Sequence, residues 1–237
     1  MNKNSEINYS TAWLEAEIGG RQRVTQVIRD IATRYDVHGR KVVELGSGIG
    51  TNLAVLAHDN DVVGVEGMAE AVARSVATGI PAIQANLEQP IPLPTGDYDW
   101  VLCIDVLEHL MNPRECLREA HRLLKSGGGL IINVPNHFDW RGRLRILAGS
   151  GIDSQHYFPD SEPWEYPHVR FFDAAGIRRF MKAAGFTVVD DYSHRFSTLP
   201  KSATLDRIGL GGINRFFQSR WPDLFGAGYF LVSTKGS

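Results

Sequence analysis

The residues whose types and spacing best suit a chemical role lie at positions 42–50, where an apolar run leads to an acid and then to three alternating glycines. Glu44 precedes Gly46, Gly48 and Gly50. Glycine is needed where a turn requires a positive φ or where a Cβ would block a ligand that approaches the backbone. A dinucleotide-binding G-x-G-x-x-G motif would have its third glycine at position 51, where the chain has Thr51. The pattern predicts a buried strand that turns sharply beneath a ligand, and Glu44 suits a ligand with an ammonium group.

This glycine-rich segment resembles the first motif of the Rossmann-like S-adenosylmethionine (SAM)-dependent methyltransferases. The resemblance implies that Glu44, Gly46, Gly48 and Gly50 accommodate the methionine part of SAM. It also implies that SAM is converted to S-adenosyl-L-homocysteine when its methyl group is transferred. It also implies the topology of the fold. We expect an α/β protein with a seven-stranded, mostly parallel sheet, helices on both faces, and a last strand that runs antiparallel between the fifth and the sixth.

The second and third predicted strands also end in residues of suitable type. Ligands of open parallel sheets bind at the carboxyl ends of the strands, and Glu66 lies at such an end, where a carboxylate can accept both ribose hydroxyl protons. Met68 suits packing on an adenine face. Asn86 stands where the family commonly has an aspartate for the adenine amino group, and an amide oxygen can accept the same bond. Leu87 follows it, and we expect all four side chains at the cofactor.

The fourth strand ends in Cys-Ile-Asp-Val-Leu-Glu-His at positions 103–109, which is similar to the EVLEHV stretch of ubiquinone-type methyltransferases. Ile104 and Asp105 are therefore expected at the cofactor. His109, His137 after the fifth strand, and His168 are candidates for a general base, because a neutral imidazole can take a hydroxyl proton near pH 7. The sequence does not choose among the three histidines. No C-x-x-C or H-E-x-x-H spacing occurs, so no metal site is predicted.

Composition narrows the class of protein. The 237 residues carry a formal net charge of −2 and are 43% hydrophobic, which favours a single domain over residues 1–237 and gives no basic excess for binding nucleic acid. Residues 1–6 are polar, unlike a signal peptide, and no apolar run is long enough to cross a membrane. We therefore expect a cytoplasmic monomer or homodimer whose two cysteines, Cys103 and Cys116, are free thiols.

Apolar runs alternate with helical patterns along the chain, as in a parallel α/β sheet. Strands are predicted at 41–45, 62–66, 82–85, 100–104, 130–134, 186–189 and 228–232. Asn112 and Pro113 are expected to begin a helix as its N-cap and first residue, and the glycines at 127–129 are expected to end it. Asp173 is expected to cap another helix, which Gly185 ends.

Two segments interrupt this alternation. Residues 137–169 are rich in aromatic and imidazole side chains, which is typical of an ordered functional loop, and we expect this insertion to form the acceptor-facing wall. Its side chains of this kind include Trp140, His156, Tyr157, Trp164, Tyr166 and His168. Residues 195–225 are apolar and basic. They fit an amphipathic surface helix that touches a membrane peripherally, or a helix packed at the sheet edge or in a dimer interface. Gly209, Gly211 and Gly212 disfavour one long helix.

Residues 134–145, 164–168 and 171–173 resemble the MetW-like branch of these methyltransferases, from which the chain departs by having Ser47 where cysteine is more usual. The predicted function is methyl transfer from SAM to a small-molecule acceptor, with a hydroxyl of a sugar, quinone or natural-product intermediate as the favoured target. One alternative is a SAM-binding regulatory partner of another biosynthetic enzyme with little turnover of its own. A nicotinamide dehydrogenase is the other, and Thr51 disfavours it.

Overall fold

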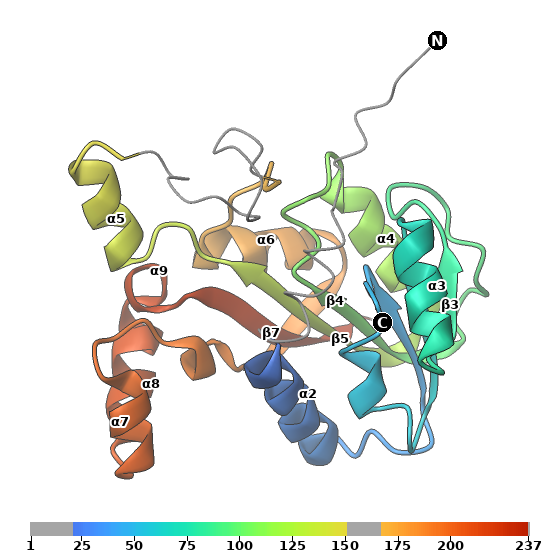
Figure 1. Ribbon diagram of the computed structural model, residues 1–237, viewed down its shortest axis with the longest axis horizontal. Coiled ribbons are helices and arrows are strands. Elements are labelled where there is room, and N and C mark those ends of the chain that lie inside the picture. Colours follow the sequence, from blue (N-terminus) through green and yellow to red (C-terminus); the bar gives the residue numbers. More distant parts are fainter. Residues whose placement is uncertain (1–20, 151–166, 237) are drawn as a thin grey trace.

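The structure is a computed structural model that describes residues 21–150 and 167–236. Its centre is a seven-stranded sheet with the strand order β3-β2-β1-β4-β5-β7-β6 (Figure 1). β7 runs antiparallel to both of its neighbours, and the other neighbouring strands are parallel. The strands are β1 Lys41–Leu45, β2 Asp61–Glu66, β3 Ala82–Gln84, β4 Tyr98–Ile104, β5 Leu124–Pro135, β6 Phe186–Asp191 and β7 Gly228–Lys235. The predicted fold class, with its antiparallel last strand between the fifth and the sixth, is confirmed.

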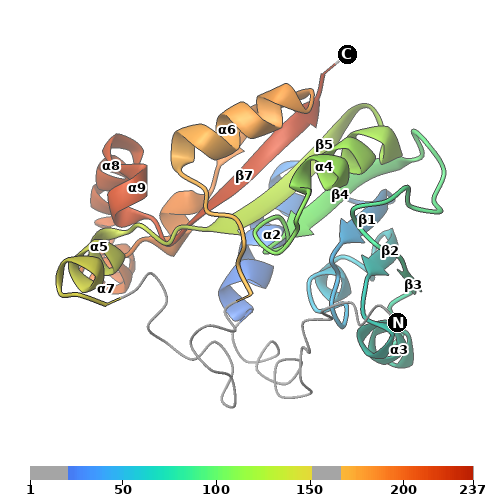
Figure 2. The same ribbon diagram turned by 90° about the horizontal axis from the view of Figure 1, so that it is seen from above.

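Helices cover both faces of this sheet (Figures 1 and 2). One buried cluster joins the sheet to α4 and α6 through Leu117 and Met181, and the other joins it to α2 through Ile28. A group of short helices, α5 and α7 to α9, gathers at one end of the molecule in both views. The helices are α2 Gln22–Arg34, η1 Leu53–Val55, α3 Ala69–Ala77, α4 Pro113–Leu123, α5 Trp140–Leu147, α6 Ala174–Ala183, η3 Ser193–Phe196, α7 Ser202–Arg207, α8 Gly211–Arg220 and α9 Pro222–Phe225.

The predicted end of α4 at the glycines 127–129 is wrong. The helix ends at Leu123, and β5 begins at Leu124, so that the glycines lie within the strand. A Cβ on Gly129 would lie 2.3 Å from the ring of Trp100 on the neighbouring strand β4, and this close approach explains the glycine there. Asp173 caps α6 as expected, by accepting a hydrogen bond from the backbone N–H of Gly176.

The two irregular segments have different outcomes. Residues 195–225 do not form one long helix, because α7 ends before Gly209, which has a φ of +79°, and α8 starts afresh at Gly211. Residues 137–150 of the aromatic insertion include α5, whereas His156, Tyr157, Trp164 and Tyr166 lie outside the described residues. The single domain over residues 1–237 stays a prediction. In the described part of the chain, no helix has the length and hydropathy needed to cross a membrane.

Asn136 fixes the chain where β5 ends. This buried side chain donates hydrogen bonds from Nδ2 to the backbone oxygens of Asp223, at 3.1 Å, and Gly226, at 2.7 Å. Its Oδ1 accepts from the backbone N–H of Phe138 at 2.9 Å. The carboxyl end of β5 is thereby tied to the segment around α9, and His137 is held between two fixed backbone positions.

We expect Asn136→Ala to lower the free energy of unfolding by about 2–3 kcal/mol, because it leaves buried backbone groups without their hydrogen-bond partner. Chemical denaturation monitored by circular dichroism measures this change. Asn112→Ala is the matched control, since Asn112 is exposed and its side chain makes no capping hydrogen bond. Equal stabilities for the two variants would contradict the role of Asn136.

Candidate functional site

A pocket of about 430 Å³ lies at the carboxyl ends of β1, β2, β3 and β4, and we call it the strand-end pocket. Parallel strands present their carboxyl ends at one edge of the sheet, and this is where open α/β sheets bind ligands. The side chains predicted at separate strand ends therefore meet here. The predicted residues that line it are Gly46, Glu66, Met68, Asn86, Leu87, Asp105 and His109.

The glycine-rich turn after β1 has the backbone that the sequence predicts. Gly46, Gly48 and Gly50 have φ values of +76°, +53° and +82°, which L side chains rarely adopt. A Cβ on Gly46 would lie 2.3 Å from a methyl group of Val106, and one on Gly50 would lie 2.7 Å from Oγ of Ser75. Gly46 lines the pocket, whereas Gly50 lets the turn pack on its neighbours.

The carboxylate of Glu66 is held by the backbone on both sides of the pocket. Its Oε2 accepts a hydrogen bond from the N–H of Gly48 at 2.9 Å, and its Oε1 accepts from the N–H of Met68 at 3.0 Å. A carboxylate oxygen can accept more than one hydrogen bond, so both oxygens keep acceptor capacity for a ligand. The two backbone N–H groups fix the orientation of the Glu66 carboxylate, and so the directions from which a ligand can donate to its oxygens.

Four of the predicted cofactor-binding residues do not line this pocket or the larger pocket beside it, and these are Gly48 and Gly50 in the glycine turn, together with Glu44 and Ile104. Glu44 is fully buried, and its Oε1 accepts a hydrogen bond from Nδ2 of Asn52 at 2.7 Å, which ties β1 to the segment after the glycine turn. Ile104 is fully buried in the core on the face covered by α2. Glu44 and Ile104 thus support the ends of β1 and β4 from inside the protein.

A second, larger pocket of about 1130 Å³ adjoins the first, and we call it the histidine pocket. Arg21, Asp105 and His109 line both pockets. Asp105 has a φ of +55°, which is unusual for a residue with a Cβ, and its Oδ1 accepts a hydrogen bond from the side chain of Asn133. The two pockets therefore share part of their lining, and the turn after β4 stands where they adjoin.

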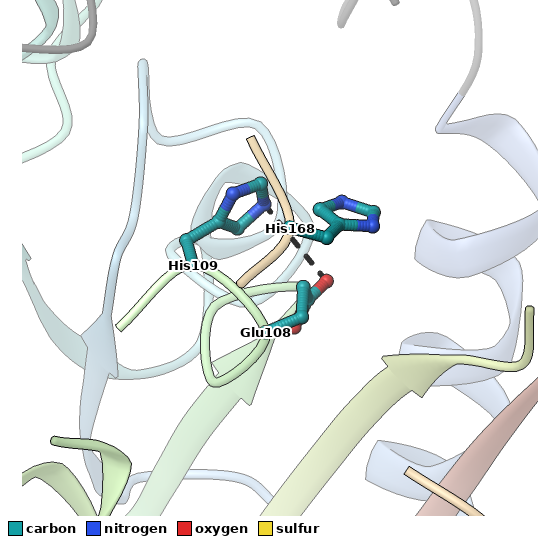
Figure 3. A group of neighbouring side chains, drawn as sticks. All are labelled: Glu108, His109 and His168. Carbon is teal, nitrogen blue, oxygen red and sulfur yellow. Dashed lines mark ion pairs between the residues drawn. The ribbon is translucent and has the colours of Figure 1, made fainter. Parts of the chain in front are cut away.

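Glu108, His109 and His168 form a compact cluster in the wall of the histidine pocket (Figure 3). Nε2 of His109 lies 3.9 Å from Oε1 of Glu108, and the rings of His109 and His168 meet edge to face with centroids 4.6 Å apart. Nε2 of His137 lies 2.7 Å from Nδ1 of His168, so these two rings share a hydrogen bond. All three predicted histidines thus lie together.

Backbone hydrogen bonds hold the two segments of this cluster together. The carbonyl oxygen of Glu108 accepts hydrogen bonds from the N–H groups of Val169, at 2.8 Å, and Arg170, at 3.1 Å. The segment that carries His168 is thereby fixed to the turn that carries Glu108 and His109.

Burial keeps the three histidines uncharged at neutral pH. It lowers the pKa of both His109 and His137 to about 4, and it lowers the pKa of His168 to about 2 with help from the two neighbouring histidines. The Glu108 side chain is only 1% exposed, and among residues 21–150 and 167–236 neither of its carboxyl oxygens has a side-chain hydrogen-bond partner. Burial, aided by the charge of Asp105, raises the pKa of Glu108 well above its ordinary value.

The same cluster contains ligand types that metal ions accept. One carboxyl oxygen of Glu108 and one ring nitrogen each of His109 and His168 lie within 4.8 Å of one another. Carboxylate and imidazole donors together suit divalent transition metals. Motifs such as C-x-x-C and H-E-x-x-H place their ligands close together in the sequence, and they do not include a set that joins positions 108 and 109 to position 168. The expectation that the protein needs no metal stays a prediction.

Several pocket residues had no signal in the sequence. Arg21 lies outside every motif, and its place at the junction follows only from the fold. Glu108 stands inside the stretch at 103–109, but nothing local distinguishes it from a solvated acid. Arg23 and Arg29 from α2 and Arg195 from the distant segment η3 also line the histidine pocket.

Comparisons with known proteins agree with this geometry. Residues 19–191 match a family described as "Methyltransferase domain". A protein of Mycolicibacterium smegmatis named "Probable S-adenosylmethionine-dependent methyltransferase" is 30% identical over 156 residues, which are 64% of this chain and 54% of that protein. The mitochondrial ubiquinone biosynthesis O-methyltransferase of Schizosaccharomyces pombe is 25% identical over 212 residues, covering 84% of this chain and 74% of that protein.

The fold comparison points the same way. A SAM-dependent methyltransferase from Aquifex aeolicus has a TM-score of 0.59 at 14% identity, over 95% of this chain and 98% of that chain. Such a low identity supports the fold alone. The chain spans about half of the length of several curated relatives that it matches.

Glu108 should make the stability of the protein fall as pH rises. A carboxyl group whose pKa is raised by folding begins to destabilise the fold once pH exceeds its unfolded pKa. The loss of stability grows until pH reaches the raised pKa and stays at its maximum above that pH. Glu108→Gln should therefore melt at a higher temperature than wild type at pH 8, with an advantage that shrinks toward pH 4.5. Differential scanning calorimetry across this pH range measures the effect.

Glu119→Gln is the control of opposite sign. The side-chain hydrogen bonds from Arg122 lower the pKa of this buried carboxylate. Its replacement should destabilise the protein at pH 8, with a loss that diminishes as pH falls through the range in which Glu119 gains its proton. A lower melting temperature for Glu108→Gln at pH 8 would show that the Glu108 carboxyl is not under the strain that its burial indicates.

Proposed function

Because this chain belongs to the class I SAM-dependent methyltransferases, we propose that it moves the methyl group of SAM to a hydroxyl of a small-molecule acceptor. Its cofactor is S-adenosyl-L-methionine. The favoured acceptors are a sugar, a quinone or a natural-product intermediate. The observation that carries the proposal is that two pockets share lining residues, one at the strand ends for the cofactor and one lined by His109 and His168.

We assign the strand-end pocket to SAM. The pair of oxygens on Glu66 suits two ribose hydroxyls, while Met68, Leu87 and Asn86 suit the adenine. Gly46 lets the methionine part approach the backbone, and Gly48 and Gly50 shape the same turn. Glu44 and Ile104 act by supporting these strand ends. Asp105 would then lie beside the reacting methyl group, where the two pockets meet.

Methyl transfer from a sulfonium is an in-line displacement at carbon. SAM supplies the activated methyl group, and the protein orients the acceptor oxygen and removes its proton. The histidine pocket offers His168 for this step. If Nδ1 of His168 donates to Nε2 of His137, then Nε2 of His168 is the ring nitrogen without a proton, whose lone pair can take the hydroxyl proton. The hydrogen bond to His137 would stabilise the imidazolium that forms.

Other parts of the predicted function go beyond the catalytic step. The relative from Schizosaccharomyces pombe is named an O-methyltransferase, which supports a hydroxyl acceptor. Peripheral membrane contact through residues 195–225 has support from exposed apolar side chains, which are Ile208, Leu210, Ile213, Phe216 and Trp221. The MetW-like branch, the cytoplasmic location, and the monomer or homodimer stay predictions.

SAM and S-adenosylhomocysteine should raise the melting temperature, whereas NAD should not, because a ligand that binds only the folded state stabilises it.

Glu66→Ala should weaken SAM binding by about 1.5–3 kcal/mol, or about 10- to 150-fold, as expected for hydrogen bonds to a charged group. Isothermal titration calorimetry measures this loss. Glu70→Ala is the control, since Glu70 is an exposed acid at the start of α3. Unchanged affinity in Glu66→Ala would move the cofactor away from the strand-end pocket.

His168→Ala should lower turnover of a true acceptor by about 10²–10⁴-fold with SAM affinity nearly unchanged, because it removes the general base. His137→Ala should cost less, since His137 acts through His168, and His109→Ala tests the remaining candidate. Release of S-adenosylhomocysteine is the measurement, with His121→Ala on the far helix α4 as the control. Normal turnover in all three would remove the histidines from catalysis. SAM binding without turnover on any hydroxyl acceptor would favour the regulatory alternative.

A further inference from the structure

A third pocket, of about 600 Å³, lies among α2, η3, α7 and α8, and we call it the arginine pocket. Arg23 from α2, Arg195 from η3 and Arg215 from α8 line it. These residues are far apart in the sequence and belong to none of the motifs that predict SAM binding. Their convergence is a property of the fold.

The arginine pocket is positively charged in a chain whose formal net charge is −2. Within the described residues, Arg23 and Arg215 make no ion pair, and Arg195 makes one, from Nη1 to Oδ2 of Asp30 at 2.6 Å. Asp206 is the one described acid that lines the pocket, and its Oδ1 accepts a hydrogen bond from Asn214 at 2.8 Å. The lining of the pocket thus holds three guanidinium groups and one carboxylate, while Asp30 outside the lining pairs with Arg195.

The backbone leaves room for these groups. A Cβ on Gly211 would lie 2.7 Å from Oδ1 of Asp206 and 3.8 Å from Nη1 of Arg215, so the guanidinium lies over the bare first turn of α8. His194 also lines the pocket, and the charges of Arg195 and Arg215 add to burial in lowering the pKa of this histidine. The field inside the pocket therefore favours an anion.

The arginine pocket adjoins the histidine pocket, because Arg23 and Arg195 line both. A molecule that reaches Glu108, His109 and His168 with one end can therefore lie between these arginines with its other end. An occupant of this kind would be larger than the group that is methylated. It would also need a negative charge at a distance from the reacting hydroxyl.

We propose that the arginine pocket binds a phosphate or diphosphate group of the methyl acceptor. Guanidinium groups present several N–H donors in a fixed fork that matches phosphate oxygens, and a diphosphate has enough oxygens to be shared among three of them. A ligand with one carboxylate group has too few oxygens to contact all three arginines. The inference rests on the proposed function, since it names the class of acceptor for the same site: a phosphorylated or diphosphate-linked small molecule with a free hydroxyl.

The test uses the full chain saturated with S-adenosylhomocysteine and titrates it with sodium pyrophosphate at constant ionic strength. We expect saturable binding by calorimetry. Arg23→Gln and Arg215→Gln should each weaken it at least 10-fold, and Asp206→Asn should strengthen it several-fold by removing the opposing charge. Arg220→Gln is the matched control, because Arg220 lies on the same helix α8 but stacks over the ring of Trp221 at 5.4 Å, outside the pocket.

Absence of saturable binding to wild type, or equal losses in Arg215→Gln and Arg220→Gln, would overturn the proposal. Binding to phosphatidylglycerol vesicles without binding to pyrophosphate would also overturn it, since the patch would then recognise a lipid surface. SAM titration of the same preparations separates the two levels of inference. If SAM binds and pyrophosphate does not, only the phosphate site falls, whereas failure of SAM to bind overturns the proposed function itself.

Discussion

The backbone carbonyl of Glu108 is the contact on which the candidate site depends. It accepts hydrogen bonds from Val169 and Arg170 and so fixes the segment before α6 to the turn after β4. The side chains on these two segments then have no freedom to separate, and His168 comes to lie against His109. Asn136 has the same effect on the third segment, because it holds the end of β5 on which His137 stands. Backbone hydrogen bonds, rather than contacts among the histidines, assemble the wall of the histidine pocket.

This assembly has an electrostatic consequence. Removing a carboxyl group and three imidazoles from water costs free energy for each charged form, so burial lowers the pKa of all three histidines and raises the pKa of Glu108. An imidazole that is uncharged near pH 7 has one ring nitrogen without a proton, and such a nitrogen can take the proton of a hydroxyl. The destabilising burial of Glu108 is of the kind found at functional sites, where strain is offset by packing elsewhere in the protein.

The sequence predicts those parts of the molecule that depend on local pattern. Alternating apolar runs locate every strand of the sheet, and chemical type at the strand ends identifies Glu66, Met68 and Asn86, which line one pocket. Glu44 shows the limit of this reasoning, because an acid at a strand end can face a ligand or, as here, face Asn52 behind the turn. The arginines at 21, 23, 195 and 215 could not be predicted, since their meeting depends on how distant elements pack. The prediction that the glycines at 127–129 end a helix was wrong for a similar reason, because the close approach of Trp100 to Gly129 comes from the neighbouring strand.

The residues that the sequence predicts and those that it does not predict lie mostly in different parts of the chain. The family match covers residues 19–191, which include all of the strand-end pocket and the three histidines. The segment after residue 191 supplies Arg195, Arg215 and Asp206, which line the arginine pocket on elements outside that match. A common cofactor requires a common set of strand ends, whereas each acceptor requires its own walls. Family membership therefore carries information about SAM, and the acceptor must be inferred from the charge and shape that η3, α7 and α8 add to the edge of the shared fold.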